Sequence, residues 1–180
     1  MKTNKLLTGL ILVAGASSVW ASSTSPGTAA PILSPLENSV RKALVMITYL
    51  SVFDDLSFTV DSNGAVTLSG EVTQPIIKDY AQKAVQHLDG VSSVNDQIEV
   101  LPLSPFDDQI RLRTLRSLQR TGSLYRYFMG VTPTIRIVVK NGHVTLDGVV
   151  QSSMDRQLAF MSANHVPGVF SVTNDLRAER

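Results

Sequence analysis

The chain is 180 residues long, with 43% hydrophobic residues, 17% charged residues, a formal net charge of +1 and no cysteine. This length accommodates one ordinary domain or two very small ones, and the apolar content is too high for a wholly disordered chain. The lack of cysteine excludes disulfides, thiolate metal sites, a thiol nucleophile and a lipid anchor on an N-terminal cysteine.

The first residues have the pattern of a secretory signal peptide. Two lysines precede an apolar run from Leu6 to Ala16, and small residues leading to Ala21 favour cleavage there. The alternative, a membrane-spanning helix, needs about 20 apolar residues, and two serines interrupt this run. We therefore predict a cleavable signal peptide at residues 1–21. A flexible lead-in at residues 22–36, rich in Ser, Thr, Pro, Gly and Ala, is expected to follow.

The rest of the chain contains the same sequence unit twice. Residues 63–98 and 141–176 are identical at 13 of 36 positions without a gap. We interpret the glycines that recur 78 positions apart as structural, serving a hairpin turn, a strand end or close backbone approach, and a helix exit. They are Gly64, Gly70, Gly90, Gly142, Gly148 and Gly168. The duplication predicts one domain at residues 37–101 and a second at residues 107–180, with a Pro-rich linker at 102–106.

The first copy predicts the element order αββαβ. Apolar residues from Val40 to Leu50 recur at helical spacing, and alternating residues from Leu56 to Val60 indicate a strand. The residues Asp61 to Gly64 indicate a hairpin turn, after which a second strand runs from Val66 to Gly70. A second helix is predicted to begin near Pro75 and to end at Gly90, before a strand within Val91–Val100. Its expected apolar face consists of Ile76, Tyr80, Ala84 and Leu88.

The second copy predicts the same order. Its elements are a helix at Ile110–Arg120, a strand at Ile135–Val139, a turn at Lys140–Gly142, a strand at Val144–Leu146, a helix at Ser152–Asn164 and a strand at Val169–Leu176. Ser152 and Asp155 resemble a capping box, and Asp107 and Asp108 are expected to complement a helix dipole. Each unit is near the lower size limit for an independent core, so we expect the two copies to pack on each other.

These motifs resemble the BON domain, a small αββαβ module of bacterial osmotically inducible and nodulation proteins. In the first copy the match lies in Gly64–Val72, Ala81 and Gly90–Val94. In the second copy it lies in Gly142–Val150, Ala159 and Gly168–Val172. The resemblance implies an α+β fold of two tandem BON-like domains, each a small mixed three-stranded sheet packed with two helices.

The resemblance also implies a function. Tandem BON proteins are typically periplasmic or outer-membrane-associated, are linked to envelope and osmotic stress, and are thought to bind phospholipid surfaces or other envelope components. We therefore expect an exported periplasmic protein of envelope maintenance that is not an enzyme and has no cofactor. Many relatives are lipoproteins; this chain lacks the cysteine, so any membrane contact is expected to be peripheral. The alternative is a protein-interaction adaptor or a holdase-like chaperone.

Other chemistry finds little support in the sequence. His87 and His165 occupy equivalent places near the ends of two predicted helices, where a protonated histidine interacts favourably with the helix dipole. His143 lies beside a hairpin turn and is expected to be solvated. A metal site would need these residues to converge, and we expect none. The sequence contains no nucleophile elbow, phosphate loop or dinucleotide fingerprint. The export signal and the near-neutral net charge argue against nucleic acid as a partner.

The two copies differ in charge. Without residues 1–21 the chain has 14 basic and 15 acidic residues, a net charge of −1. Residues 37–101 contain four basic and nine acidic side chains, a net charge of −5, whereas residues 107–180 contain ten and six, a net charge of +4. This asymmetry suggests divided roles or electrostatic docking of one copy on the other.

The second copy also contains an insertion of about eight or nine residues within Thr121–Gly130, relative to the first copy. We hypothesise that this insertion and the preceding arginine face contact anionic lipid or another partner. The alternative is a solvated arginine face beside a loop that folds back as core or as the interdomain seam. The candidate surface consists of Arg113, Arg116, Arg120, Tyr125, Arg126, Tyr127 and Phe128.

Overall fold

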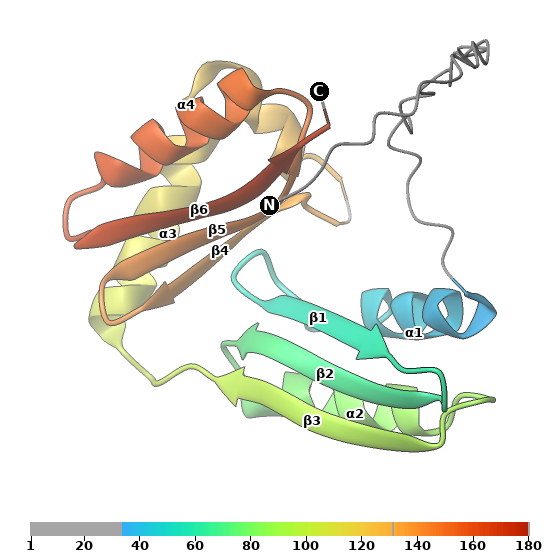
Figure 1. Cartoon of the computed structure of the whole chain (residues 1–180). Coiled ribbons are helices and arrows are strands. Elements are labelled where there is room, and N and C mark those ends of the chain that lie inside the picture. The colour runs from blue at the N-terminus through green and yellow to red at the C-terminus, as the bar shows by residue number, and fades with distance from the viewer. Residues whose placement is uncertain (1–33, 131, 180) are drawn as a thin grey trace, which may run out of the picture. The chain divides into compact units, whose positions relative to one another are not determined.

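The computed structural model describes residues 34–130 and 132–179. The predicted signal peptide lies outside the described residues, as does the predicted lead-in up to residue 33. The described chain forms two three-stranded sheets, in the orders β1–β2–β3 and β4–β5–β6 (Figure 1). Each sheet has one antiparallel pair and one parallel pair and packs with helices. The predicted α+β fold of two tandem αββαβ domains is therefore confirmed.

The first domain contains α1 (Pro35–Val45), β1 (Asp55–Val60), β2 (Ala65–Val72), α2 (Pro75–Gln86) and β3 (Ser93–Val100). Helix α1 begins where a capping box forms, because the Ser34 hydroxyl accepts from the Glu37 amide while the Glu37 carboxylate accepts from the Ser34 amide. The helix therefore includes residues 35 and 36 of the predicted lead-in. It ends at Val45, and Ile47 and Leu50 follow in tight turns rather than in the helix that was predicted to include them.

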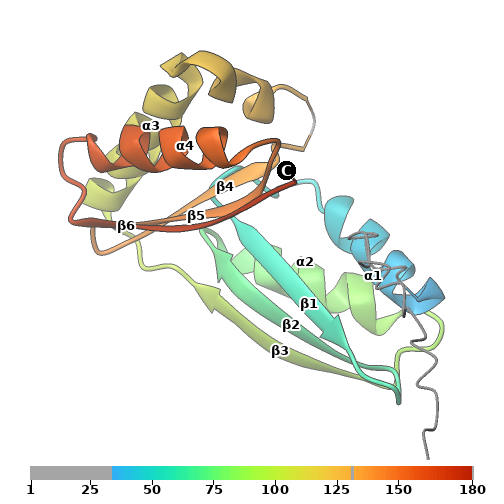
Figure 2. The same ribbon diagram turned by 45° about the horizontal axis from the view of Figure 1, so that its top comes forward.

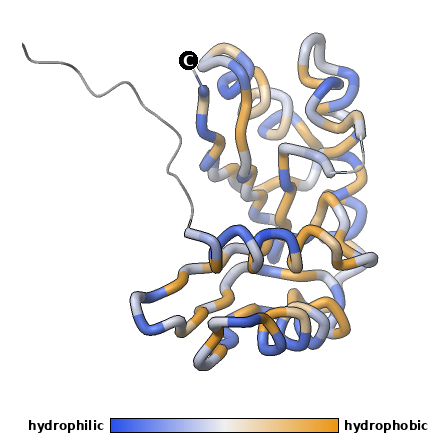
Figure 3. Tube along the Cα trace, turned by 90° about the vertical axis from the view of Figure 1, so that its right-hand side faces the viewer, coloured by the Kyte–Doolittle hydropathy of each residue, from blue (hydrophilic) through white to orange (hydrophobic). Residues whose placement is uncertain are grey.

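Helix α2 buries a different face from the predicted one. Its buried residues are Ile77, Ala81 and Val85, whereas Ile76 and Tyr80 are exposed. The prediction was wrong because the helix has two apolar stripes. They are offset by one residue in sequence, which corresponds to a rotation of about 100° around the helix axis. The small Ala81 lets the helix approach the sheet closely, as Ala159 does in the second domain. Figure 3 shows apolar and polar residues alternating along the helices.

The second domain contains α3 (Pro105–Arg120), the 3₁₀ segment η1 (Gly122–Phe128), β4 (Ile135–Lys140), β5 (His143–Val150), α4 (Ser153–Asn164) and β6 (Ser171–Ala178). Helices α3 and α4 lie along the same side of the sheet (Figure 2). Helix α3 begins five residues before the predicted start, because the Ser104 hydroxyl caps it and Pro105 suits its first turn.

Asp107 does more than complement the dipole of α3. Its buried carboxylate accepts hydrogen bonds from the amides of Asn141 and Gly142, at 2.9 and 2.8 Å. These two residues form the β4–β5 turn, and both have positive φ, as a two-residue hairpin turn requires. The start of α3 is thereby attached to the sheet on which the helix packs.

Gly70 and Gly148 have the same role in the two domains. Both have a positive φ, and a Cβ on either would overlap a carbonyl oxygen of the adjacent strand segment, at Asp55 and Thr134 respectively. The backbone of the neighbouring chain therefore approaches too closely for any side chain.

We expect Gly148→Ala to lower the free energy of unfolding by about 2–3 kcal/mol, because it adds a backbone clash to an unfavourable φ. Chemical denaturation monitored by circular dichroism would measure this effect. Gly130→Ala is the matched control, since Gly130 also has a positive φ but no atom lies within 4 Å of an added Cβ. Equal destabilisation by the two variants would contradict the role of the close approach.

The two domains contact each other through the segment before β1. The Ile137 amide donates to the carbonyl of Val52, and the Arg136 guanidinium donates to the carbonyl of Ser51, both at 2.9 Å. Lys140 of the basic domain also forms an ion pair with Glu99 of the acidic one, with 2.6 Å between Nζ and Oε1. Burial, followed by the Asp147 charge, raises the pKa of Asp55 at this seam, against the opposing effect of Arg136.

Candidate functional site

Three arginines of α3 line one groove. Arg113, Arg116 and Arg120 are exposed, and their spacing of three and four residues places them on one face of the helix. The groove lies between the C-terminal half of α3 and the residues that follow α4. We call it the arginine groove; it is lined by Arg113, Arg116, Ser117, Arg120, Thr121, His165, Val166 and Pro167.

Hydroxyl groups fix the two walls of the arginine groove. The Ser117 hydroxyl lies 2.9 Å from the carbonyl oxygen and from the hydroxyl of Ser162, and the Thr121 hydroxyl lies 2.8 Å from the same Ser162 hydroxyl. These bonds join α3 to α4 directly beside the arginines. The guanidinium of Arg113 also donates across the groove to the carbonyl of Pro167, at 3.2 Å. The helices on either side of the arginines are therefore joined by side-chain hydrogen bonds.

The positive charge of the arginine groove is uncompensated. None of its lining residues is acidic, and within residues 34–130 and 132–179 neither Arg116 nor Arg120 has an ion-pair partner. Several closely spaced guanidinium groups without carboxylates attract an anion, and arginine can bind a phosphate or carboxylate through two parallel hydrogen bonds. The arrangement can therefore hold an anionic group.

The insertion folds back onto the domain. Leu124 and Tyr127 of η1 are buried in the second core, and Phe128 packs against that core. Tyr127 and Phe128 therefore do not belong to the exposed surface that the sequence suggested, because a domain this small gains from added apolar cover. Tyr125 and Met129 remain 52% and 59% exposed. The alternative of a loop that folds back as core thus holds for part of the insertion.

Asp155 holds the insertion in place. Its buried carboxylate accepts hydrogen bonds from the hydroxyls of Ser123, Tyr127 and Ser152 and from the Arg126 guanidinium, the Tyr127 bond being 2.8 Å long. The hydrogen bond from Ser123, together with those from Tyr127 and Ser152, lowers the pKa of Asp155 in spite of its burial. Burial also raises the pKa of Tyr127. Arg126 therefore belongs to this cluster and not to the arginine groove.

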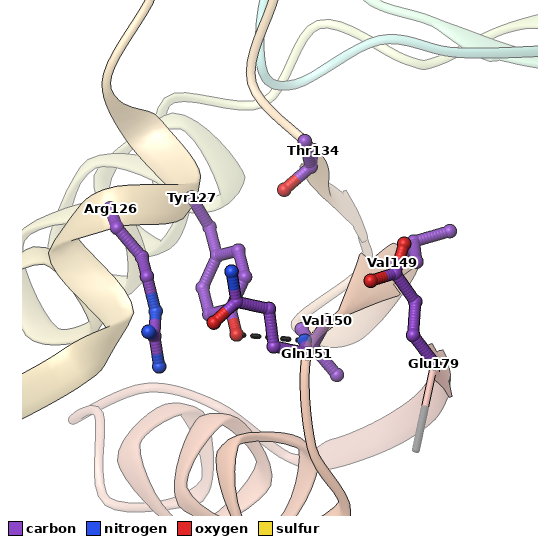
Figure 4. A pocket seen from close by; sticks show the side chains of 7 residues that line it. All are labelled: Arg126, Tyr127, Thr134, Val149, Val150, Gln151 and Glu179. Atoms are coloured by element: carbon purple, nitrogen blue, oxygen red, sulfur yellow. Dashed lines mark hydrogen bonds between the residues drawn. The ribbon is translucent and has the colours of Figure 1, made fainter.

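A second hollow lies where η1 meets the end of β5 (Figure 4). The Arg126 guanidinium on one side is already paired with Asp155, at 2.9 Å, and lies over the Tyr127 ring. The Tyr127 hydroxyl accepts from the amide of Gln151, also at 2.9 Å. The polar groups of this hollow thus serve mainly to attach the insertion, which makes the arginine groove the better candidate site.

The two equivalent histidines have equivalent structural roles. The Nδ1 atoms of His87 and His165 lie 2.8 and 2.6 Å from the carbonyl oxygens of Lys83 and Met161, four residues earlier in each helix. His143 pairs instead with the hydroxyl of Ser171. In the described part of the chain, no group of three or more His, Asp or Glu residues is placed to hold a metal ion.

Sequence reasoning found the arginines of the groove but missed the structural roles of two buried aspartates. The helical spacing of Arg113, Arg116 and Arg120 predicted their common face. Asp155 was predicted only as part of a capping box with Ser152, whose hydroxyl accepts from the Asp155 amide. No local signal indicates its contacts with Ser123 and Tyr127, which lie 32 and 28 residues away in sequence. No local signal marks Asp54 either, which is fully buried.

Comparison with known proteins identifies the family of both halves. The family model described as BON domain matches residues 34–102 and, separately, residues 107–180. No curated protein matches the chain significantly. Among solved structures, the C-terminal domain of CdsD, a structural protein of the type III secretion system of Chlamydia trachomatis, is 14% identical, with a TM-score of 0.33 over 82% of this chain and 99% of that one. A second CdsD structure has 14% identity and a TM-score of 0.31, over 77% of this chain and 90% of that one.

Among the described residues, no helix is long and apolar enough to cross a bilayer.

Proposed function

Since the chain belongs to the BON domain family, whose members are typically periplasmic or envelope-associated and generally not enzymes, we propose that it works at the cell envelope by binding anionic phospholipid headgroups. The observation that supports this proposal is the arginine groove, with three exposed guanidinium groups and no carboxylate among its lining residues. We further propose that it acts after export and removal of residues 1–21, in envelope maintenance or stress.

The chemistry of the groove suits a membrane surface. A phosphodiester headgroup supplies the anionic oxygens that guanidinium groups bind, and the negative surface potential of an anionic leaflet attracts clustered arginines. The insertion within Thr121–Gly130 has two large exposed side chains, Tyr125 and Met129, and tyrosine is a residue type that favours the membrane interface.

Vesicle flotation tests this function. Vesicles containing about a third phosphatidylglycerol in phosphatidylcholine should carry the purified protein, whereas pure phosphatidylcholine vesicles should not. We expect the variant Arg113→Glu/Arg116→Glu to lose at least tenfold in apparent affinity, because two attractive charges become repulsive, and binding should weaken with added salt.

A control with the same change in net charge separates the groove from the overall charge of the domain. Arg156→Glu/Arg177→Glu alters two exposed arginines outside the groove. This control should bind vesicles within about twofold to threefold of the unchanged protein, since the effect of a distant charge is screened beyond about 10 Å. Equal losses in both variants, or unchanged binding in the groove variant, would refute a headgroup site in the arginine groove.

The second candidate function, a protein-interaction adaptor, is favoured by a different surface. The helical side of the first domain has a groove with exposed apolar side chains, which commonly mark interaction sites.

A further inference from the structure

The first domain has an apolar groove between α1 and α2. It is lined by Ala43, Met46, Ile47, Thr48, Tyr49, Tyr80, Lys83 and Ala84, and its cavity volume is about 590 Å³. Met46 is 81% exposed and Tyr49 is 56% exposed, although both are large apolar residues. The rings of Tyr49 and Tyr80 stack at 6.0 Å with 13° between their planes. Two alanines therefore contribute to a hollow bordered by aromatic and thioether side chains.

The second domain covers part of the equivalent place with its own chain. There, α3 continues to Arg120, whereas α1 stops at Val45, the counterpart of Leu115. The additional turn of α3 and the insertion pack against α4, where Ser117 and Thr121 hydrogen-bond to Ser162. The first domain has Ile47 and Ala84 at the positions of Ser117 and Ser162 and has no insertion. The counterparts of Ala43, Met46 and Ile47 line the arginine groove, so the second domain covers only the part of the equivalent place beside Ser162, which the first domain leaves open beside Ala84.

The surroundings of the apolar groove are basic within an acidic domain. Helices α1 and α2 carry all four basic residues of residues 37–101 but only two of the nine acidic ones. Three of these basic residues, Arg41, Lys42 and Lys83, are exposed. Lys83 lines the groove, and its counterpart in the second domain is the uncharged Met161. A ligand of this groove should therefore have apolar side chains that enter the groove and acidic side chains beside them.

We infer that the apolar groove binds a short helical segment of a partner protein, with apolar side chains four residues apart and acidic residues beside them. This segment would take the place that the additional turn of α3 and η1 occupy in the second domain. Helix-in-groove recognition commonly uses apolar anchors at this spacing. The concave, alanine-lined shape fits inserted side chains better than a flat bilayer does, which favours a peptide over a lipid surface. The inference is independent of the lipid-binding function, since it concerns the other domain.

Two synthetic peptides test the inference. Both are capped, alanine-based helices of 15 residues with Leu and Phe four residues apart; one carries Glu at the flanking positions and the other carries Lys. Binding would be measured by titrating each peptide into the full chain labelled with ¹⁵N. We expect the Glu peptide to bind at least tenfold more tightly than the Lys peptide and to shift amide signals within residues 43–49 and 80–84.

Variants of the apolar groove test whether its charge and its open volume determine peptide binding. Lys83→Glu, at an exposed position, should reduce the preference for the Glu peptide to less than threefold or reverse it. Ala84→Trp should fill the groove and abolish binding of both peptides. The matched control is Met161→Glu at the equivalent exposed position of the second domain, which should leave the affinity unchanged.

Several results would overturn the inference. These are equal affinity for the two peptides, amide shifts confined to the second domain, no shift at millimolar peptide, or an undiminished preference in Lys83→Glu. A dimer in sedimentation that Met46→Ser dissociates would instead assign the apolar groove to a second copy of the chain. Loss of vesicle flotation in Met46→Ser, with no peptide binding, would assign it to the lipid surface.

Discussion

Replacing Asp54 with alanine is expected to lower the free energy of unfolding by about 4 kcal/mol. The Asp54 carboxylate is fully buried, and its oxygens accept four hydrogen bonds. Two come from the amide and hydroxyl of Ser51, at 2.8 and 2.5 Å, and two from the amide and hydroxyl of Thr73, at 2.6 and 2.8 Å. Alanine would leave two backbone amides without acceptors in a partly buried place, so the cost exceeds that of a single lost hydrogen bond.

The effect of Asp54→Ala should extend to the second domain. Asp54 fixes the segment that includes Ser51 and Val52, whose carbonyls accept hydrogen bonds from Arg136 and Ile137. Urea denaturation would measure the stability, and hydrogen exchange of the Ile137 amide would report the contact between domains. We expect that amide to exchange at least tenfold faster in the variant.

A second aspartate provides the control for Asp54→Ala. Asp61 also accepts two backbone amides, those of Asn63 and Ala65 at 2.8 Å, but it is exposed in a hairpin turn. Asp61→Ala should therefore lower the free energy of unfolding by only about 1 kcal/mol, because water can replace the lost acceptor. Comparable losses at the two positions would contradict the argument that burial determines the effect.

The tandem fold could be predicted because its signals are local. The paired glycines, the Asn141–Gly142 turn and the alternating strand residues each depend on neighbours within a few positions. The buried face of α2 could not be predicted in the same way. Ile76 and Tyr80 offer an apolar stripe, as Ile77 and Ala81 do, and only the sheet packed against the helix distinguishes the two faces.

The candidate site likewise has a part that could be predicted from local sequence and a part that could not. The common face of Arg113, Arg116 and Arg120 follows from helix geometry, and the structure brings all three to one groove. The position of Tyr127 does not follow from composition, since an aromatic cluster between two glycines fits an exposed loop and a buried one equally well. What decides the matter is Asp155, a residue whose contact with the insertion exists only in the folded domain.

Asp155→Asn is expected to lower the free energy of unfolding by about 3 kcal/mol at neutral pH. The buried carboxylate accepts from three hydroxyls and one guanidinium, and an amide would present an N–H group where only donors lie. Ser123→Ala removes one of these donors and should lower the free energy of unfolding by about 1 kcal/mol. Urea denaturation would measure both variants, and near-ultraviolet circular dichroism would show whether Tyr127 loses its fixed environment.

The pH dependence of Asp155→Asn follows from the lowered pKa of the carboxyl group. A group whose pKa falls on folding contributes stability that is fully present above its unfolded value, near 3.8, and that is lost as the pH falls through the lower folded value. The difference in stability between the unchanged protein and Asp155→Asn should therefore be constant from pH 7 to about 5 and should shrink below pH 4. A difference that stays constant down to pH 2, or that grows there, would show that the charge of Asp155 does not hold the insertion. The insertion would then depend on the burial of Leu124 and Tyr127 alone.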